Sequence, residues 1–70
     1  MEIVLNGQPR TVGLDAQTAT VEALITALEM KQDRIAVERN GDIVRRTDWP
    51  TTVVQSGDRF EIVHFVGGGM

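Results

Sequence analysis

The first residues of the chain alternate between polar and apolar, which predicts a β-hairpin. Over residues 2–6, Ile3 and Leu5 fall on one face, as in a half-buried strand. Asn6-Gly7 follows, and this dipeptide between two strand-like runs is the strongest short signal for a tight hairpin turn. The returning strand is predicted over residues 10–14. Its inward-facing side chains are expected to be Val12 and Leu14.

A helical period replaces the alternation after Thr20. Apolar residues recur at the spacing i, i+3, i+4, i+7 and form one stripe: Val21, Leu24, Ile25 and Leu28. Thr20 is the expected N-cap, because Glu22 then lies in the first turn, near the positive end of the helix dipole. The helix is predicted over residues 21–30, with Lys31 near its negative end.

The second half of the chain returns to strand-like patterns. Asn40-Gly41 repeats the hairpin turn chemistry, and Pro50 argues against a central strand after Trp49. The last strand should place Phe60, Ile62 and His64 on one face, and Glu61, Val63 and Phe65 on the other. The expected elements are strands over residues 35–39 and 59–66, a short strand or extended segment over 42–46, a short strand or loop over 51–54, and a turn over 55–58.

This order of elements predicts a single α+β domain. A mixed four- to five-stranded sheet would have one amphipathic helix packed across one face, since the two layers must bury each other's apolar sides. A hairpin, a crossover helix and further strands make up a β-grasp arrangement. We expect the domain to cover residues 1–66, followed by a flexible glycine-rich tail over residues 67–70.

Composition removes several classes of function. The chain has no cysteine, which excludes disulfides, iron–sulfur clusters, thiolate metal sites and a cysteine nucleophile. No apolar run is long enough to span a bilayer, and no signal peptide is visible at residues 1–4, so a cytoplasmic protein without membrane partners is expected. The formal charge is −3, and the basic residues form no nucleic-acid-binding cluster.

The glycine run Gly67-Gly68-Gly69 is the strongest functional signal. A frayed terminus would be the ordinary explanation, but it does not require glycine. A tail without side chains can enter a narrow channel and place a terminal carboxylate in the active site of a partner. The four residues after Val66 span at most about 14 Å, enough to reach into a cleft.

A terminal carboxylate becomes reactive when ATP adenylates it, and a sulfur nucleophile can then displace the adenylate to give a thiocarboxylate. The chain contains no phosphate-binding loop between a strand and a helix. The residues that perform the adenylation must therefore belong to a partner. We expect no catalytic residue and no bound cofactor or metal in this chain, with ATP used by the activating partner.

Other candidate side chains lie within the domain. His64 is the only histidine, so a packed or hydrogen-bonded structural role is expected, because it has no companion for metal or triad chemistry. Ser56 and Asp58 are expected to be turn residues. Glu38 and Glu61 lie on predicted strands, and nothing in the sequence pairs them.

Val63 and Phe65 allow two interpretations. They point away from the expected helix side of the last strand, just before the tail. If that face is open, they form an exposed apolar patch of the kind that marks protein contacts. Alternatively, Trp49 or another segment covers them.

Several segments resemble the ThiS family of sulfur carriers in thiamine biosynthesis. The final stretch, Glu61-Ile62-Val63-His64-Phe65-Val66-Gly67-Gly68-Gly69, is similar to the end of ThiS proteins. Residues 5–7, 37–40 and 56–58 also look like ThiS segments. The resemblance covers the whole chain, and length and element order agree with it.

The resemblance implies a ubiquitin-like β-grasp fold and a set of partners. A ThiF-type adenylyltransferase would adenylate the C-terminal glycine with ATP, and a cysteine desulfurase route would supply the sulfur. The thiazole synthase ThiG would receive it. Gly69 would carry the sulfur, next to Gly68, and the partner-binding residues would be Val63, Phe65 and Val66.

One residue departs from the family pattern. Met70 follows the glycines, and while it is attached the Gly69 carbonyl is an amide that cannot be adenylated. Either a peptidase removes Met70 before use, or Met70 is an artefact of the recorded sequence. Three other functions use related features: a MoaD-like sulfur carrier for molybdopterin synthesis, a ubiquitin-like protein modifier, and a binding module without covalent chemistry.

Overall fold

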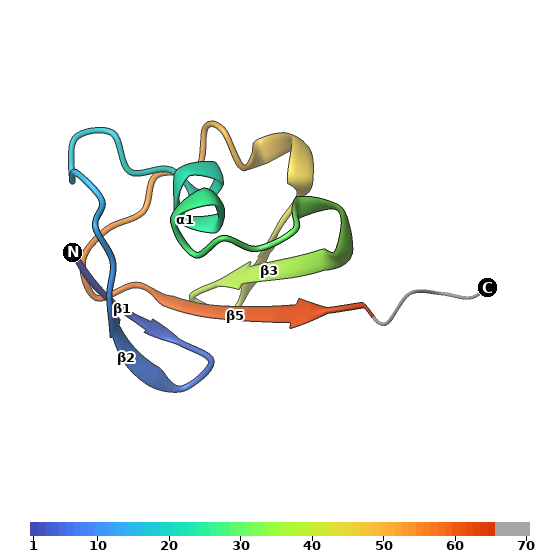
Figure 1. Ribbon diagram of the computed structural model, residues 1–70, viewed down its shortest axis with the longest axis horizontal. Coiled ribbons are helices and arrows are strands. Elements are labelled where there is room, and N and C mark those ends of the chain that lie inside the picture. The colour runs from blue at the N-terminus through green and yellow to red at the C-terminus, as the bar shows by residue number, and fades with distance from the viewer. Residues whose placement is uncertain (66–70) are drawn as a thin grey trace.

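A mixed five-stranded sheet with one α-helix across one face forms the fold in the computed structural model, which describes residues 1–65 (Figure 1). The strand order is β2-β1-β5-β3-β4; β1 and β5 are parallel, and the other neighbouring pairs are antiparallel. The predicted α+β sheet and its single helix are confirmed. The elements are β1 (Glu2–Leu5), β2 (Gln8–Thr11), α1 (Val21–Ala27), the 3₁₀ turn η1 (Gln32–Arg34), β3 (Ile35–Arg39), β4 (Asp42–Val44), the 3₁₀ turn η2 (Arg46–Asp48) and β5 (Arg59–His64).

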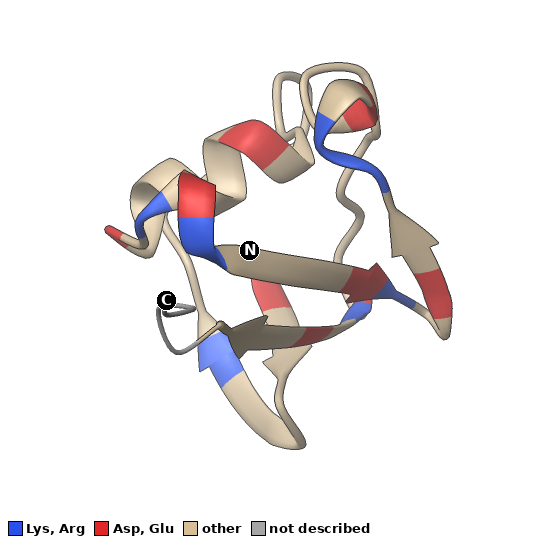
Figure 2. Ribbon diagram, turned by 90° about the vertical axis from the view of Figure 1, so that its right-hand side faces the viewer, with Lys and Arg blue, Asp and Glu red and all other residues tan. Residues whose placement is uncertain are grey.

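Charged residues are spread over the strands, the helix and the loops, with acidic and basic segments intermixed (Figure 2). The net charge of −3 is therefore not gathered on one side of the described molecule. No helix within residues 1–65 is long and apolar enough to cross a membrane.

Both Asn-Gly dipeptides form the predicted turns. Asn6 and Gly7 have φ angles of 50° and 80°, and Asn40 and Gly41 have 51° and 90°. Two consecutive positive φ values are what a two-residue type I′ hairpin requires, and they match the right-handed twist of the strands.

The strand after the first turn is shifted from its predicted position. We predicted it over residues 10–14, whereas β2 begins at Gln8 and ends at Thr11. A two-residue turn makes Gln8 pair directly with Leu5, and the pairing ends where Thr11 meets Glu2. Beyond it, Val12 is buried and Leu14 is partly buried, so both face inward as predicted although neither lies in a strand.

The helix begins as predicted but is shorter. Thr20 is the N-cap, and its hydroxyl accepts a 3.1 Å hydrogen bond from the backbone amide of Ala23. The predicted end at Met30 is wrong, because α1 ends at Ala27 and Glu29 adopts a left-handed φ of 58°. The amides of Glu29 and Met30 donate to the carbonyls of Thr26 and Ile25, which is the Schellman termination pattern.

Because the helix ends early, Lys31 is not in its last turn and precedes η1 instead. Glycine usually occupies the left-handed position of such a terminus. A glutamate there gives no signal in the sequence, which explains the wrong prediction.

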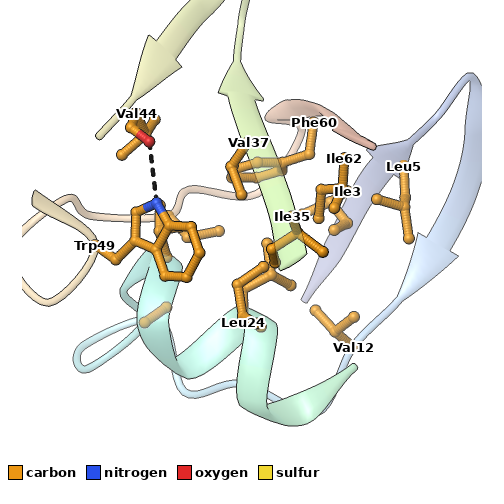
Figure 3. Close-up of a cluster of buried hydrophobic side chains, with 14 residues drawn as sticks. Ile3, Leu5, Val12, Leu24, Ile35, Val37, Val44, Trp49, Phe60 and Ile62 are labelled. Carbon is orange, nitrogen blue, oxygen red and sulfur yellow. Dashed lines mark hydrogen bonds between the residues drawn. The ribbon is translucent and has the colours of Figure 1, made fainter. Parts of the chain in front are cut away.

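The core lies between α1 and the sheet (Figure 3). Phe60, Leu24 and Val21 are fully buried, and Trp49 is 2% exposed. The Trp49 indole Nε1–H donates a 3.0 Å hydrogen bond to the carbonyl of Val44, so its polar group is satisfied inside the core (Figure 3). The other buried apolar residues are Ile3, Leu5, Val12, Ala19, Ile25, Ile35, Val37, Val44, Val54 and Ile62.

The connection between β4 and β5 contains little regular structure. Of the short strand or extended segment predicted over residues 42–46, the strand β4 ends at Val44, and η2 follows. Residues 51–54 form a loop with one isolated bridge between Thr20 and Val53. The predicted turn is confirmed, because the Asp58 amide donates to the Gln55 carbonyl at 3.0 Å.

Candidate protein-docking face next to the tail

The sheet face opposite α1 carries exposed apolar side chains. Side chains alternate along a strand, so burying Phe60 and Ile62 of β5 under α1 directs Val63 to the other face. Val63 is 60% exposed, and Phe65, directly after β5, is 58% exposed. Ile43 of β4 is 72% exposed on the same face. We call this surface, made up of Ala36, Glu38, Ile43, Glu61, Val63 and Phe65, the open face.

Trp49 does not cover the open face. It is packed in the core with Leu24 and Val37, on the helix side of the sheet (Figure 3). The alternative in which Trp49 shields Val63 and Phe65 is therefore wrong. An apolar group this exposed, at the end of the strand that leads to the glycine run, has the character of a protein contact.

The register of the sheet places the residues of the open face in rows. Val63 lies opposite Ala36, and Glu61 lies opposite Glu38. Glu38 in turn lies opposite Ile43. The open face thus combines apolar residues near the tail with two glutamates one step farther along the sheet.

β5 is held in this position by side-chain hydrogen bonds from a residue of the first hairpin. The Asn6 Oδ1 accepts a 2.8 Å hydrogen bond from the Ile62 amide, and the Asn6 Nδ2–H donates to the Ile62 carbonyl at 3.1 Å. The turn residue thereby extends the β1–β5 pairing beyond Leu5 and Phe60, where the strand partners end. The sequence predicted Asn6 as a turn former only, because Ile62 is 56 residues away along the chain.

Asp58 anchors the start of β5. Its carboxylate accepts hydrogen bonds from the Arg39 Nε–H at 2.8 Å, the Asn40 Nδ2–H at 3.1 Å and the Gln55 amide at 2.8 Å. Burial by itself would raise the pKa of Asp58, but these hydrogen bonds and the Arg39 charge outweigh it and hold the pKa below its ordinary value of 3.8. Asp58 is a turn residue as predicted, and it is also buried and holds the start of β5, a role that its neighbours in the sequence do not indicate.

His64 is not packed, which was one of the two structural roles that we predicted for it. His64 lies on the same face of β5 as Phe60 and Ile62. It is nevertheless exposed, because α1 does not extend over this end of β5. It lines a shallow cleft at the end of the sheet. The other residues of the cleft are Glu29, Met30, Lys31, Asp33 and Arg34.

The sulfur-carrying positions predicted from the resemblance, Gly68 and Gly69, lie outside the described residues. The same is true of Gly67, Met70 and the predicted partner-binding Val66. Of the predicted site, the structure describes Val63 and Phe65, and it brings them together at the tail end of the open face.

A sequence model of the ThiS family matches residues 3–69. This match covers nearly the whole chain, including the glycine run. The chain belongs to the ThiS family.

Solved and curated ThiS proteins agree with this assignment. The crystal structure of the thiamine biosynthesis protein ThiS from Geobacter metallireducens has a TM-score of 0.82 and 36% identity, and the match covers 99% of this chain and 100% of that one. The sulfur carrier protein ThiS of Bacillus subtilis is 34% identical over 65 residues, which is 93% of this chain and 96% of the relative. The ubiquitin-like β-grasp fold expected from the ThiS resemblance is thereby confirmed.

Two other relatives are much longer. The thiazole synthases of Paramagnetospirillum magneticum and Magnetococcus marinus are 41% and 42% identical to this chain over 69 residues. The match covers 99% of this chain but only 20% of each relative, so the chain spans about one fifth of their length.

Proposed function

We propose that this ThiS-family chain is a sulfur carrier protein that delivers sulfur for the thiazole of thiamine. The observation that carries the proposal is the open face, where Val63 of β5 and Phe65 directly after it are exposed just before the glycine run. An exposed apolar surface next to a run without side chains suits a protein that docks on an enzyme and inserts its end into the active site.

The chemistry takes place at Gly69. A carboxylate oxygen of Gly69 attacks the α-phosphorus of ATP and releases pyrophosphate, which leaves a mixed anhydride with AMP. Hydrosulfide then displaces AMP and leaves a thiocarboxylate, whereas a persulfide leaves an acyl disulfide that a thiol must reduce. The chain supplies no catalytic residue and holds no cofactor in this scheme. Gly67 and Gly68 allow the backbone to pass through a narrow channel.

The proposed partners follow from this chemistry. A ThiF-type adenylyltransferase uses ATP to activate the carboxylate, and a cysteine desulfurase supplies the sulfur. Thiazole synthase accepts it. This last partner is supported by the two thiazole synthases that contain a region similar to this chain, because proteins that work together are often joined in one polypeptide. Val63, Phe65 and Val66 form the docking contacts.

Met70 must leave before the reaction. Its peptide bond makes the Gly69 carbonyl an amide, which is not a substrate for adenylation. We propose that a peptidase cleaves the Gly69–Met70 bond.

The test is the intact mass of the protein purified from its native host, before and after treatment with a thiol-alkylating reagent. Replacement of oxygen by sulfur and oxidation of one methionine give nearly the same mass increase, and the chain has three methionines. Alkylation separates the two, because a chain without cysteine has no other strongly nucleophilic sulfur. We expect a species that ends at Gly69 and takes up one alkyl group.

The matched control is the same protein shortened to end at Gly68, incubated with ATP, the ThiF-type enzyme and a sulfur source. It should alkylate much less than the form that ends at Gly69. Absence of alkylation in the Gly69 form under these conditions would refute the sulfur-carrier function.

A further inference from the structure

We propose that Glu38 and Glu61 together bind an arginine side chain of the enzyme that activates the tail. The inference rests on the proposed function, since it concerns the partner that receives the glycine run. The two glutamates lie directly opposite each other on β3 and β5, on the open face.

The hydrogen-bond pattern shows how close the two backbones are. The Asn40 amide donates to the Arg59 carbonyl at 2.7 Å, and the Phe65 amide donates to the Arg34 carbonyl at 2.8 Å. Hydrogen-bonded pairs recur at every second residue of an antiparallel ladder, so the pair formed by Glu38 and Glu61 is of the same type. The Cα atoms of such a pair are about 5.5 Å apart, and the two side chains leave the sheet on the same side.

Two carboxylates in this arrangement repel each other, and like charges directly opposite on a sheet are destabilising. Within residues 1–65 the only ion pair closer than 4 Å is the one between Arg39 and Asp58. Arg59 lies two residues before Glu61 in β5, on the same side of the sheet, but it forms no such ion pair with either glutamate. In the described part of the protein, neither glutamate is therefore held in an ion pair closer than 4 Å.

The surroundings of the pair favour arginine as the missing cation. Ile43 lies beside Glu38 in the register, and Val63 lies one step along β5 from Glu61. A guanidinium group is planar, carries five N–H donors and is weakly hydrated, so it can hydrogen-bond to two carboxylates while its faces contact apolar groups. When an interface closes over the pair, loss of water strengthens this attraction.

The position of the pair places it within the footprint of an enzyme that draws the tail into its active site. Phe65 lies four positions after Glu61 in extended chain, a distance of about 13 Å. A standard protein interface covers about 800 Å² on each partner, which is a disc with a radius of about 16 Å. An enzyme that docks around the base of the tail to draw Gly69 into its active site therefore also covers Glu38 and Glu61.

The test compares two double variants of the full chain with equal net charge. Glu38→Gln/Glu61→Gln removes the pair, whereas Glu22→Gln/Asp48→Asn removes two exposed acidic side chains on the helix side. Each changes the formal charge from −3 to −1, because two acids are lost. Calorimetric titration against the ThiF-type enzyme of the same organism gives Kd at about 50 mM and about 300 mM salt.

We expect Glu38→Gln/Glu61→Gln to raise Kd about tenfold at low salt and to reduce the dependence of Kd on salt. The helix-side variant should change Kd less than about twofold. The denaturant midpoint of Glu38→Gln/Glu61→Gln should be unchanged or higher, because repulsion has been removed. Loss of affinity without loss of stability is what separates a binding role from a structural one.

Two results would overturn the inference: an unchanged Kd for Glu38→Gln/Glu61→Gln, or an equal rise in both double variants, which would indicate general charge attraction. Adenylation of the wild-type chain ending at Gly69, followed by pyrophosphate release, is measured in parallel. If the wild type is adenylated and Kd does not respond, only this inference fails. If the wild type binds and is never adenylated, the proposed function fails and the inference fails with it.

Discussion

The two faces of the sheet are made from similar residues and have opposite surroundings. On the helix side, Phe60 and Ile62 of β5 are 0% and 3% exposed. On the open face, Val63 and Phe65 at the end of the same strand are 60% and 58% exposed. All four side chains are apolar, so the difference arises from what lies over the strand and not from the residues themselves.

The comparison shows how one short strand can serve both stability and recognition. Burying a large apolar side chain contributes about 1.5–3 kcal/mol, and the helix side gains this free energy on folding. The open face gains it only when a partner covers it. The following predictions test this division of roles, beginning with the largest expected effect.

The sharpest contrast is between Phe60→Ala and Phe65→Ala. Phe60→Ala should lower the free energy of unfolding by about 3–5 kcal/mol, because it leaves a cavity in the core. Domains of this size rarely have more than about 3–5 kcal/mol of stability, so this variant should be largely unfolded at 25 °C. Phe65→Ala should change the free energy of unfolding by less than about 0.5 kcal/mol. Urea denaturation followed by circular dichroism measures both.

Phe65→Ala should instead weaken binding to the activating enzyme, by about tenfold in Kd. The milder variant Phe60→Leu serves as the control, because it should lose some stability but bind normally once folded. Equal loss of stability in Phe60→Ala and Phe65→Ala would contradict the division between the two faces.

Asp58→Asn should lower the free energy of unfolding by about 2 kcal/mol at pH 7, because a buried acceptor of three hydrogen bonds becomes partly a donor. The loss should depend on pH. The pKa of Asp58 in the folded protein is below its ordinary value of 3.8. Its stabilising contribution is therefore fully present above that value and is lost as the pH falls through the folded pKa.

The wild type should accordingly lose more stability than Asp58→Asn as the pH falls below the ordinary carboxyl pKa of 3.8. Unfolding free energies measured by urea titration at several pH values test this. Because Asp58 lies at the start of β5 and away from the open face, Asp58→Asn should retain its affinity for partners at pH 7. Parallel curves for the two proteins below pH 4 would argue against the role assigned to Asp58.

The smallest effect concerns the cap of the helix that covers one face. Thr20→Ala should lower the free energy of unfolding by about 1 kcal/mol, because the Ala23 amide loses its acceptor. Thr26→Ala is the matched control: its exposed hydroxyl donates only to the Glu22 carbonyl one turn earlier, and alanine has the higher helix propensity. A thermal melt should show a lower midpoint for Thr20→Ala only. Equal midpoints for the two variants would mean that the cap contributes nothing measurable.

Much of the fold could be predicted because its signals are local. Alternation placed Ile3 and Leu5 in the core, the helical period began at Thr20, and both Asn-Gly turns formed with the expected backbone angles. The helix end could not be predicted, because Glu29 adopts a left-handed conformation in which glycine is the usual residue.

Of the candidate site, Val63 and Phe65 could be named from the sequence, but their exposure could not. Alternation places residues on two faces without stating which face is covered. The site residues Gly67 to Gly69 were predicted from composition and from the ThiS resemblance, and the assignment of the chain to that family supports looking for its chemistry there.

The sequence by itself determined the element order, the two tight turns, the helix start and the glycine run, because each depends on residues close together in the chain. Only the tertiary structure decided which face stays open, how Asn6 and Asp58 hold β5, and that Glu38 and Glu61 lie opposite each other. These features depend on strand register between distant segments. A shift of one residue in that register would exchange the two faces, and no local pattern reports it.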